Sequence, residues 1–191
     1  RFGLQVLAVW RLQNVLLDHV EAGKAPLLLN MDETSISRHM LAPKGNMWWR
    51  PQRKRGPLRP AEKVSKSHLR QCVTYCAMIT DDRDVQPLLP QWILVNVTTV
   101  TAGALPDVQA AMPAHVHIHR AKTAWQTSES MCALVKALAD SLAPFMATRQ
   151  PILLVDSARQ HLTAAVQDAA TEAGIWLVPI SGRTTALIQP A

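Results

Sequence analysis

Two short apolar runs, each ending in an aspartate, constrain the fold of this chain more than any other feature. The first is PLLLNMD, which ends at Asp32, and the second is PILLVD, which ends at Asp156. A continuous apolar run of this length is typical of a strand that is buried on both faces of a sheet. We therefore expect two inner strands of one sheet, each with a carboxylate at its end.

Helical periodicity predicts three helices around these runs. Apolar residues recur at helical spacing over 4–22, and Gly23 supplies a stop signal. The segment 127–146 opens with a Thr or Ser cap and keeps its apolar residues on one face, which predicts a second helix. A third helix is expected over 160–173, ending at Gly174.

Strand signals complete a mixed sheet. Residues 70–80 and 85–96 are β-forming segments joined by the turn signal DDRD, and they predict an antiparallel pair. Pro87 and Pro90 cannot donate ladder hydrogen bonds, so we expect the second strand to be an edge strand or a bulged one. A last strand is expected over 175–180. The strand, helix, strand order late in the chain predicts parallel neighbours, so the fold class is α/β with helices flanking a mixed sheet.

Positive charge is concentrated in one stretch. Lys and Arg number 20 against 14 Asp and Glu, and eight of the 20 lie within 50–70, where the only acid is Glu62. Pro and Gly prevent a long regular element over 39–67, so we expect a loop or an irregular hairpin arm. A solvated loop is one interpretation. Because Trp48 and Trp49 accompany the cations, contact with DNA is the other, through Arg53, Lys54, Arg55, Lys63 and Lys66.

Other features bound the class of protein. Charged residues or prolines interrupt the apolar segments before they reach membrane-spanning length, so no transmembrane helix is expected. Three cysteines without a secretory signal favour reduced thiols. The start, RFGLQVLAVW, has neither an initiator Met nor a signal sequence, and we expect the chain to be part of a longer protein.

The two aspartates suit metal chemistry if their strands are parallel neighbours. Asp32 and Asp156 would then project at the same carboxyl edge, where α/β sheets usually carry their sites. Two adjacent carboxylates repel each other unless a cation lies between them, and oxygen ligands suit Mg²⁺ or Mn²⁺. Such ions can activate a water or a 3′-hydroxyl for attack on a phosphodiester. The alternative for a lone Asp is a turn carboxylate that accepts local N–H groups. Glu33 should point to the opposite face from Asp32, which favours a structural role.

Four short segments carry a resemblance to a known family. They are NMDETSI at 30–36, TAWQTSESM at 123–131, PILLVDSARQHLT at 151–163 and IWLVPISGRTTALIQP at 175–190. Together they resemble the catalytic domain of DDE transposases, most closely the pogo and Tigger branch of the mariner-like superfamily. The family's D-E-T motif falls on Asp32. Its D-N-A-x-x-H motif falls on Asp156, with Ala158 and His161 in register.

The resemblance implies a fold and a function. The fold is RNase H-like (ribonuclease H-like), a five-stranded mixed sheet in the order 3-2-1-4-5 flanked by helices, over 26–191 after a helical lead-in at 1–25. The implied activity is cleavage and strand transfer of DNA, with Asp32 and Asp156 as the catalytic residues and as ligands of Mg²⁺ or Mn²⁺. Transposon-end DNA is the implied partner, a homodimer is a further expectation, and the location is the nucleus in a eukaryote or the cytoplasm otherwise.

This chain also departs from the family pattern. Ser157 stands where Asn is usual, Arg159 where Pro is usual, and Ser181 with Gly182 where a Pro pair is common. The family's third acid follows the Q-P motif, and this chain ends at Ala191, so we expect that ligand beyond the 191 residues and expect the isolated chain to be inactive. A degenerate or domesticated relative that binds DNA without catalysis is the alternative.

Several side chains have a structural and a functional interpretation. His161 could orient Asp156 or contact phosphate, and a local hydrogen bond at a helix start is the alternative. The HVHIH stretch at 115–119 favours an extended segment with exposed imidazoles over a metal site. The buried apolar positions are expected to include Cys72 and Cys76 on one strand face. The interfaces between sheet and helices are expected to contain Trp92, Trp125 and Trp176.

Overall fold

A computed structural model describes residues 17–37 and 72–180. Several sequence predictions lie outside these residues: positions 4–16 of the helix expected over 4–22, the basic stretch over 50–70 with its five expected DNA contacts, and the T-T-x-L-x-Q-P motif after residue 180. The described part of the first helix is a short 3-10 turn, η2 (Leu17–His19). Gly23 has a φ of +92°, a conformation that suits glycine at a stop signal.

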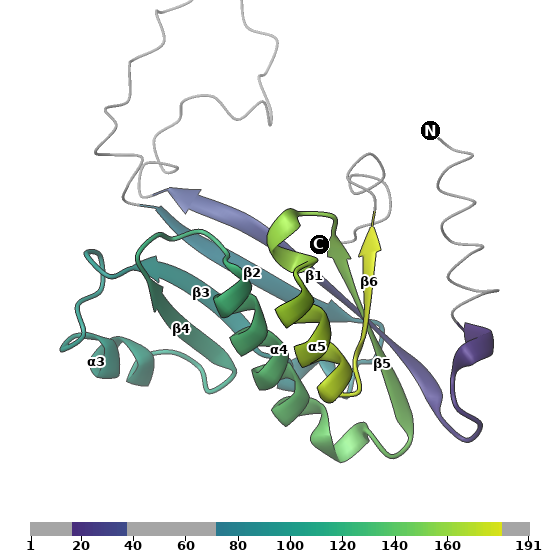
Figure 1. Ribbon diagram of the computed structural model, residues 1–191. Helices are drawn as coiled ribbons and strands as arrows, with labels where there is room; N and C mark the ends of the chain where they lie inside the picture. Colours follow the sequence, from purple (N-terminus) through teal and green to yellow (C-terminus); the bar gives the residue numbers. More distant parts are fainter. Residues whose placement is uncertain (1–16, 38–71, 181–191) are drawn as a thin grey trace, which may run out of the picture.

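The centre of the fold is a six-stranded mixed sheet in the order β4-β3-β2-β1-β5-β6 (Figure 1). Strands β1, β2 and β3 are successively antiparallel, whereas β5 and β6 run parallel to β1, and β4 runs parallel to β3. The strands are β1 (Ala25–Ser37), β2 (Cys72–Thr80), β3 (Gln91–Asn96), β4 (Val116–Ala121), β5 (Arg149–Asp156) and β6 (Trp176–Ile180).

The five strands expected from the sequence are present in the expected RNase H-like order, 3-2-1-4-5. One strand was not expected: the HVHIH stretch, predicted as an extended segment outside the sheet, forms most of β4. Because β4 pairs with β3 along its whole length, from Gln91 with Val116 to Asn96 with Ala121, the interpretation of β3 as an edge strand is wrong.

The two prolines that suggested an edge lie before β3. Pro87 is part of a 3-10 turn, η3 (Gln86–Leu88), and Pro90 immediately precedes the strand. The buried side chain of Gln91 then binds the backbone of β2 on the side where Pro90 cannot donate. Its Nε2 donates to the carbonyl of Met78 at 2.8 Å, and its Oε1 accepts from the N–H of Met78 at 3.0 Å and from the hydroxyl of Tyr75 at 2.8 Å.

Replacing Gln91 by Leu should lower the free energy of unfolding by about 1–3 kcal/mol, because the buried N–H of Met78 would lose its partner, whereas the carbonyl of Met78 keeps the hydrogen bond from Gln86. Urea unfolding followed by circular dichroism measures the change. The matched control is Gln167→Leu, at an exposed position of the last helix, where a change within about 0.5 kcal/mol is expected. Equal destabilisation by the two variants would contradict the role assigned to Gln91.

Two helices cover one face of the sheet (Figure 1). α4 (Ser128–Leu142) begins with Thr127 as its N-cap in a capping box with Ser130, and η4 (Ala143–Phe145) follows it. α5 (Ala164–Glu172) is shorter than expected, because its predicted first turn is a separate 3-10 turn, η5 (Arg159–His161). Gly174 ends this region with a φ of +67°, as predicted. A short helix that was not expected, α3 (Leu105–Ala110), lies between β3 and β4.

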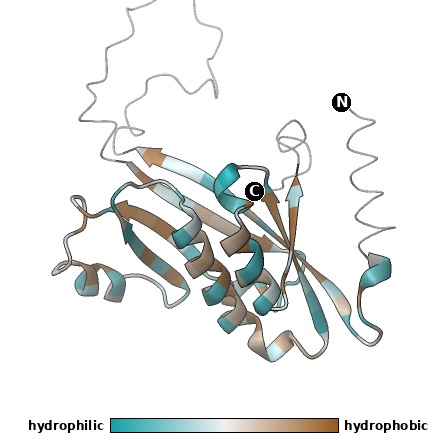
Figure 2. Cartoon of the chain, viewed as in Figure 1, coloured by the Kyte–Doolittle hydropathy of each residue, from teal (hydrophilic) through white to brown (hydrophobic). Residues whose placement is uncertain are grey.

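The core lies between the sheet and α4 and α5. Odd-numbered residues of β1, namely Leu27, Leu29 and Met31, join the apolar stripe of α4 in this core. Leu28 lies on the opposite face, in a smaller cluster that includes Ile152. Figure 2 shows the apolar colouring of the central strands and the mixed colouring of the helices. Among the described residues, no helix has both the length and the apolar character needed to cross a bilayer.

The three tryptophans expected between sheet and helices have different surroundings. Trp92 is in the core as predicted. Trp176 lies in the cluster on the other face of the sheet, and Trp125 has 64% of its surface exposed, so the prediction is wrong for both. Aromatic size predicts burial, but the face of a strand and the path of a loop are fixed by their neighbours.

Candidate active site

Asp32 lies within β1 rather than at its end. The antiparallel pairing of β1 with β2 continues to Ser37, whereas the parallel pairing with β5 stops at Asn30, opposite Leu154. The strand is therefore longer than the apolar run predicted, because β2 supplies hydrogen-bond partners for the polar residues after Asp32. Asp32 lies just beyond the point where β5 separates from β1.

Asp156 is the last residue of β5 and shares a sheet face with Asp32. Side chains alternate along a strand, and the register pairs Leu28 with Ile152 and Asn30 with Leu154. Continuing this alternation by two residues on each strand places Asp32 and Asp156 in the same row on the same face. The parallel pairing of β1 with β5, which the sequence prediction required, is present and ends two residues before each aspartate.

Each aspartate uses one carboxylate oxygen locally. Oδ1 of Asp32 accepts the N–H of Glu33 at 2.9 Å, and Oδ1 of Asp156 accepts the N–H of Ala158 at 3.0 Å. Within residues 17–37 and 72–180, no hydrogen bond or ion pair engages the Oδ2 atom of either aspartate. The structural interpretation of a lone Asp was that its carboxylate accepts local N–H groups. Each aspartate does so, but with only one of its two oxygens.

His161 connects the two strands from the face covered by the helices. Its Nδ1 lies 2.7 Å from Oδ1 of Asp156, and its Nε2 lies 2.7 Å from Oε1 of Glu33. The imidazole is 3% exposed, and the Glu33 side chain 18%. Glu33 lies on the opposite face of β1 from Asp32, as expected, and it holds the histidine that holds Asp156.

The ionisation of His161 follows from these contacts. Burial alone lowers the pKa of an imidazole, but the hydrogen bond with Glu33 and the negative charges of Glu33 and Asp156 outweigh it, so the pKa of His161 is raised. An imidazole donates through both ring nitrogens only when it is protonated. Both ring nitrogens of His161 lie against carboxylate oxygens, so neither is free to ligate a metal ion.

The electrostatics of Asp32 show the repulsion between neighbouring acids. Burial raises the pKa of Asp32, the hydrogen bond from the N–H of Glu33 opposes this rise, and the charges of Asp156 and Glu33 add to it. Cys76, which pairs with Glu33 across β1 and β2, experiences the same field: burial, with the charges of Glu33 and Asp32, raises the pKa of its thiol to about 12. It is a buried, unreactive thiol, as expected.

The site is incomplete as a metal centre within the part of the chain that the structure describes. No group of three or more His, Cys, Asp or Glu side chains that could hold a metal ion occurs there. His117 and His119 instead lie near the indole of Trp92, with ring centroids 6.0 and 5.1 Å away, and burial lowers the pKa of His119. Their imidazoles are partly buried rather than exposed, while His115 is exposed as predicted.

Sequence reasoning missed one link between α4 and this edge. The hydroxyl of Ser128, in the first turn of α4, donates to the carbonyl of Gln160 at 3.4 Å, so the start of α4 lies beside η5. Ser157 and Arg159, which depart from the family pattern, are exposed at this edge. The T-S-E sequence at 127–129, part of the family resemblance, marked the start of this helix, but it does not show that the helix start contacts η5.

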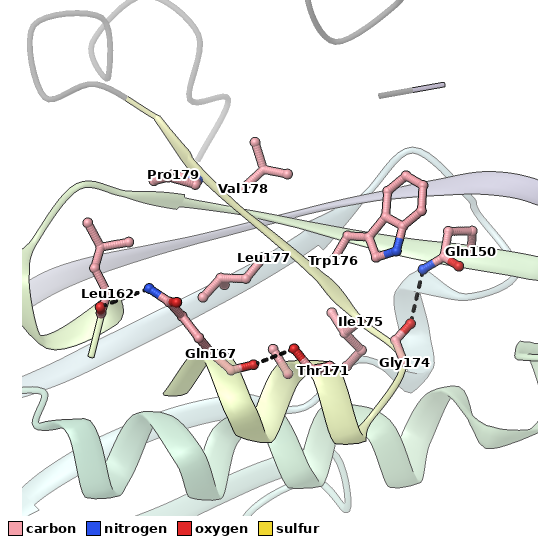
Figure 3. Close-up of a pocket in the computed structure, with 11 residues that line it drawn as sticks. Gln150, Leu162, Gln167, Thr171, Gly174, Ile175, Trp176, Leu177, Val178 and Pro179 are labelled. Atoms are coloured by element: carbon pink, nitrogen blue, oxygen red, sulfur yellow. Dashed lines mark hydrogen bonds between the residues drawn. The ribbon is translucent and has the colours of Figure 1, made fainter. Parts of the chain in front are cut away.

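A pocket between α5, β6 and Gln150 is separate from these acids (Figure 3). Its wall includes Gln167 and Thr171 from α5 and Leu177 from β6, and none of its lining residues is ionisable. The residues that line the pocket in the described part of the chain therefore supply no charged ligand and no general acid or base.

Comparisons with known proteins add little beyond this geometry. The chain matches no protein-family model and no curated protein. Among solved structures it is similar to one described as "Mos1 transposase paired-end complex with left transposon end", with a TM-score of 0.46 and 13% identity over 95% of this chain. The match covers 41% of that chain, so the present chain spans less than half of its length. A likeness of this size concerns the arrangement of the chain, and no residue role is taken from it.

Proposed function

We propose that this chain belongs to the catalytic domain of a DNA-cleaving and strand-transferring enzyme of the transposase type, in which Asp32 and Asp156 bind Mg²⁺ or Mn²⁺. The observation that supports the proposal is the parallel pairing of β1 and β5, which ends at Asn30 and Leu154; if side-chain alternation continues for two residues on each strand, the two acids share one face. The motifs that resemble the pogo and Tigger branch support the same assignment.

The two carboxylates have the chemistry that such an ion requires. Hard oxygen atoms are the preferred ligands of Mg²⁺ and Mn²⁺. The Oδ2 atoms have no partner among the described residues. Burial, with the charges of Asp156 and Glu33, raises the pKa of Asp32, and a divalent cation would relieve the repulsion between the acids. The family resemblance implies a third acid, which would complete the proposed ligand set.

The protein residues would act by positioning. Bound metal ions would supply activation of a water or a 3′-hydroxyl and would stabilise the leaving oxygen of the phosphodiester. Glu33 would hold His161, and His161 would hold Oδ1 of Asp156. The other oxygen of Asp156, Oδ2, would then be available to the metal ion in a fixed orientation. The basic stretch, including Arg53 and Lys54, would hold the DNA backbone.

A metal-binding experiment on the chain itself tests this proposal. Electron paramagnetic resonance of free Mn²⁺ gives a binding isotherm, and we expect Asp32→Asn and Asp156→Asn each to weaken Mn²⁺ binding by about tenfold or more. The control is Asp140→Asn, which alters an exposed acid of α4 and should leave binding unchanged. Indistinguishable isotherms for the wild type and both site variants would refute the metal assignment.

A DNA-binding relative without catalysis is the second candidate. It is favoured by the exposed Ser157 and Arg159, which replace the family's usual Asn and Pro at the rim of the site. It shares the proposed DNA partner and differs in lacking metal-dependent cleavage. A homodimer, and a nuclear location if the source is eukaryotic, remain parts of the first proposal.

A further inference from the structure

Trp125 is an apolar side chain that the fold keeps in water. It is 64% exposed, the highest value among the exposed large hydrophobic residues of the described chain, whereas its neighbours Ala124 and Gln126 are each 6% exposed. Burying a large apolar side chain is worth about 1.5–3 kcal/mol relative to leaving it exposed. A partner that covers this indole would gain a comparable stabilisation.

The exposure of Trp125 is imposed by the anchoring of the residues on both sides of it. The hydroxyl of Thr74, in β2, donates to the carbonyl of Ala124. The Gln126 side chain accepts from the thiol of Cys76 at 3.5 Å and donates to Sδ of Met131 at 3.6 Å. Because both neighbours are fixed to the core, the intervening side chain is held outwards in a defined position.

This position is close to the proposed catalytic edge. Cys76, which binds Gln126, pairs directly with Glu33 in β1. On the other side, the contact between Ser128 and Gln160 holds the start of α4 beside η5, and Figure 1 shows this helix start next to the turn that precedes α5. The loop that carries Trp125 therefore lies on the helix-covered face, beside the segment of β1 that contains Asp32 and Glu33 and near η5, which follows Asp156.

Exposed cations occur in the two segments that adjoin Trp125. Lys122 precedes it by three residues, and Arg159 lies in η5, which the hydrogen bond from Ser128 to Gln160 joins to the start of α4; Glu129, in the first turn of α4, is an exposed acid. An aromatic side chain with flanking cations is the arrangement by which proteins bind unpaired nucleic-acid bases, since the cations hold phosphates while the ring stacks on a base.

We propose that Trp125 is a DNA-positioning residue that stacks on an unpaired base next to the phosphodiester presented to Asp32 and Asp156. The inference rests on the proposed function, because it requires DNA at this edge. It adds a contact that selects DNA with an unstacked base near the cleaved bond, and stacking of this kind tolerates any base. A protein partner covering Trp125 is the competing outcome.

Fluorescence and binding to DNA test this inference on the 191-residue chain. The ligands are a single-stranded oligonucleotide with 2-aminopurine at successive positions and the matching duplex. Trp125→Ala should weaken binding to the single strand by about tenfold or more, and Trp125→Phe should restore most of it. The dependence of binding on salt should stay unchanged in both variants, since neither alters a charge, whereas Lys122→Gln should reduce that dependence.

The matched control is Leu88→Ala, which removes another exposed apolar side chain, 47% exposed, in the turn before β3. It should bind DNA as the wild type does. If Trp125→Ala binds the single strand with wild-type affinity while the wild type binds DNA, the stacking role is wrong and the proposed function stands. If the wild type binds neither oligonucleotide, the inference and the proposed function both fail. An unchanged melting temperature of Trp125→Ala shows that any loss is not a loss of fold.

Discussion

Replacing Asp32 or Asp156 by asparagine should lower Mn²⁺-dependent nicking of transposon-end DNA by about 10³-fold. The ligand carboxylate contributes several kcal/mol of charge stabilisation in the transition state through the metal, and each 1.36 kcal/mol is a factor of ten in rate. Asparagine keeps the size of the side chain and an oxygen that can accept the local N–H groups of Glu33 and Ala158. The fold should therefore survive while the ligand charge is lost.

The measurement is a single-turnover nicking assay on the protein extended beyond Ala191 to include the proposed third acid. Asp140→Asn serves as the control, because it removes an exposed carboxylate on α4 without touching the site. Wild-type nicking in both site variants would exclude these acids as ligands. Absence of nicking by the extended wild-type protein, together with retained DNA binding, would favour the non-catalytic candidate.

Removing His161 should cause the largest loss of stability among the site residues. His161→Ala leaves Glu33, whose side chain is 18% exposed, without its partner, and deleting one member of a buried ion pair costs about 3–5 kcal/mol. Because Glu33 retains some access to water, we expect a loss near the lower end, about 2–4 kcal/mol. Urea unfolding of the 191-residue chain measures it.

The control for this variant is His115→Ala, at an exposed position before β4, where the change should stay within about 0.5 kcal/mol. A second measurement separates positioning from stability. In His161→Gln, which can still donate to one carboxylate, Mn²⁺ affinity should recover part of what His161→Ala loses. If His161→Ala binds Mn²⁺ as the wild type does, the histidine supports the fold and does not position Asp156.

Apolar runs, helical periodicity and glycine stop signals predicted many of the strands and helices, because the conformation of such a segment depends largely on its own residues. The apolar runs before Asp32 and Asp156 became the adjacent parallel strands β1 and β5, and the capped periodic segment became α4. Gly174 ended α5 because a positive φ is easily adopted only by glycine. The formation of each strand and helix requires only residues that are close in sequence, whereas the pairing of β1 with β5 joins two distant segments.

The sequence predictions were wrong where pairing with a distant strand determines the structure. HVHIH pairs as β4 because β3 offers it a free side, and β1 continues past Asp32 because β2 extends its ladder. Pro87 and Pro90 did not make β3 an edge, since both precede the strand and β4 pairs with β3 along its whole length. None of these partners is visible in the local sequence.

For the site, the sequence by itself determined that two apolar strands each lead to an aspartate, Asp32 and Asp156, because an apolar run is a property of neighbouring residues. It also placed Asp32 and Glu33 on opposite faces, since that follows from the two-residue repeat of a strand. Only the tertiary structure decided that Glu33 binds His161, which lies 128 residues away in sequence, and that this histidine holds Asp156. Such a contact exists because the sheet brings β1 beside β5, and the burial of the resulting network gives its charges their strength.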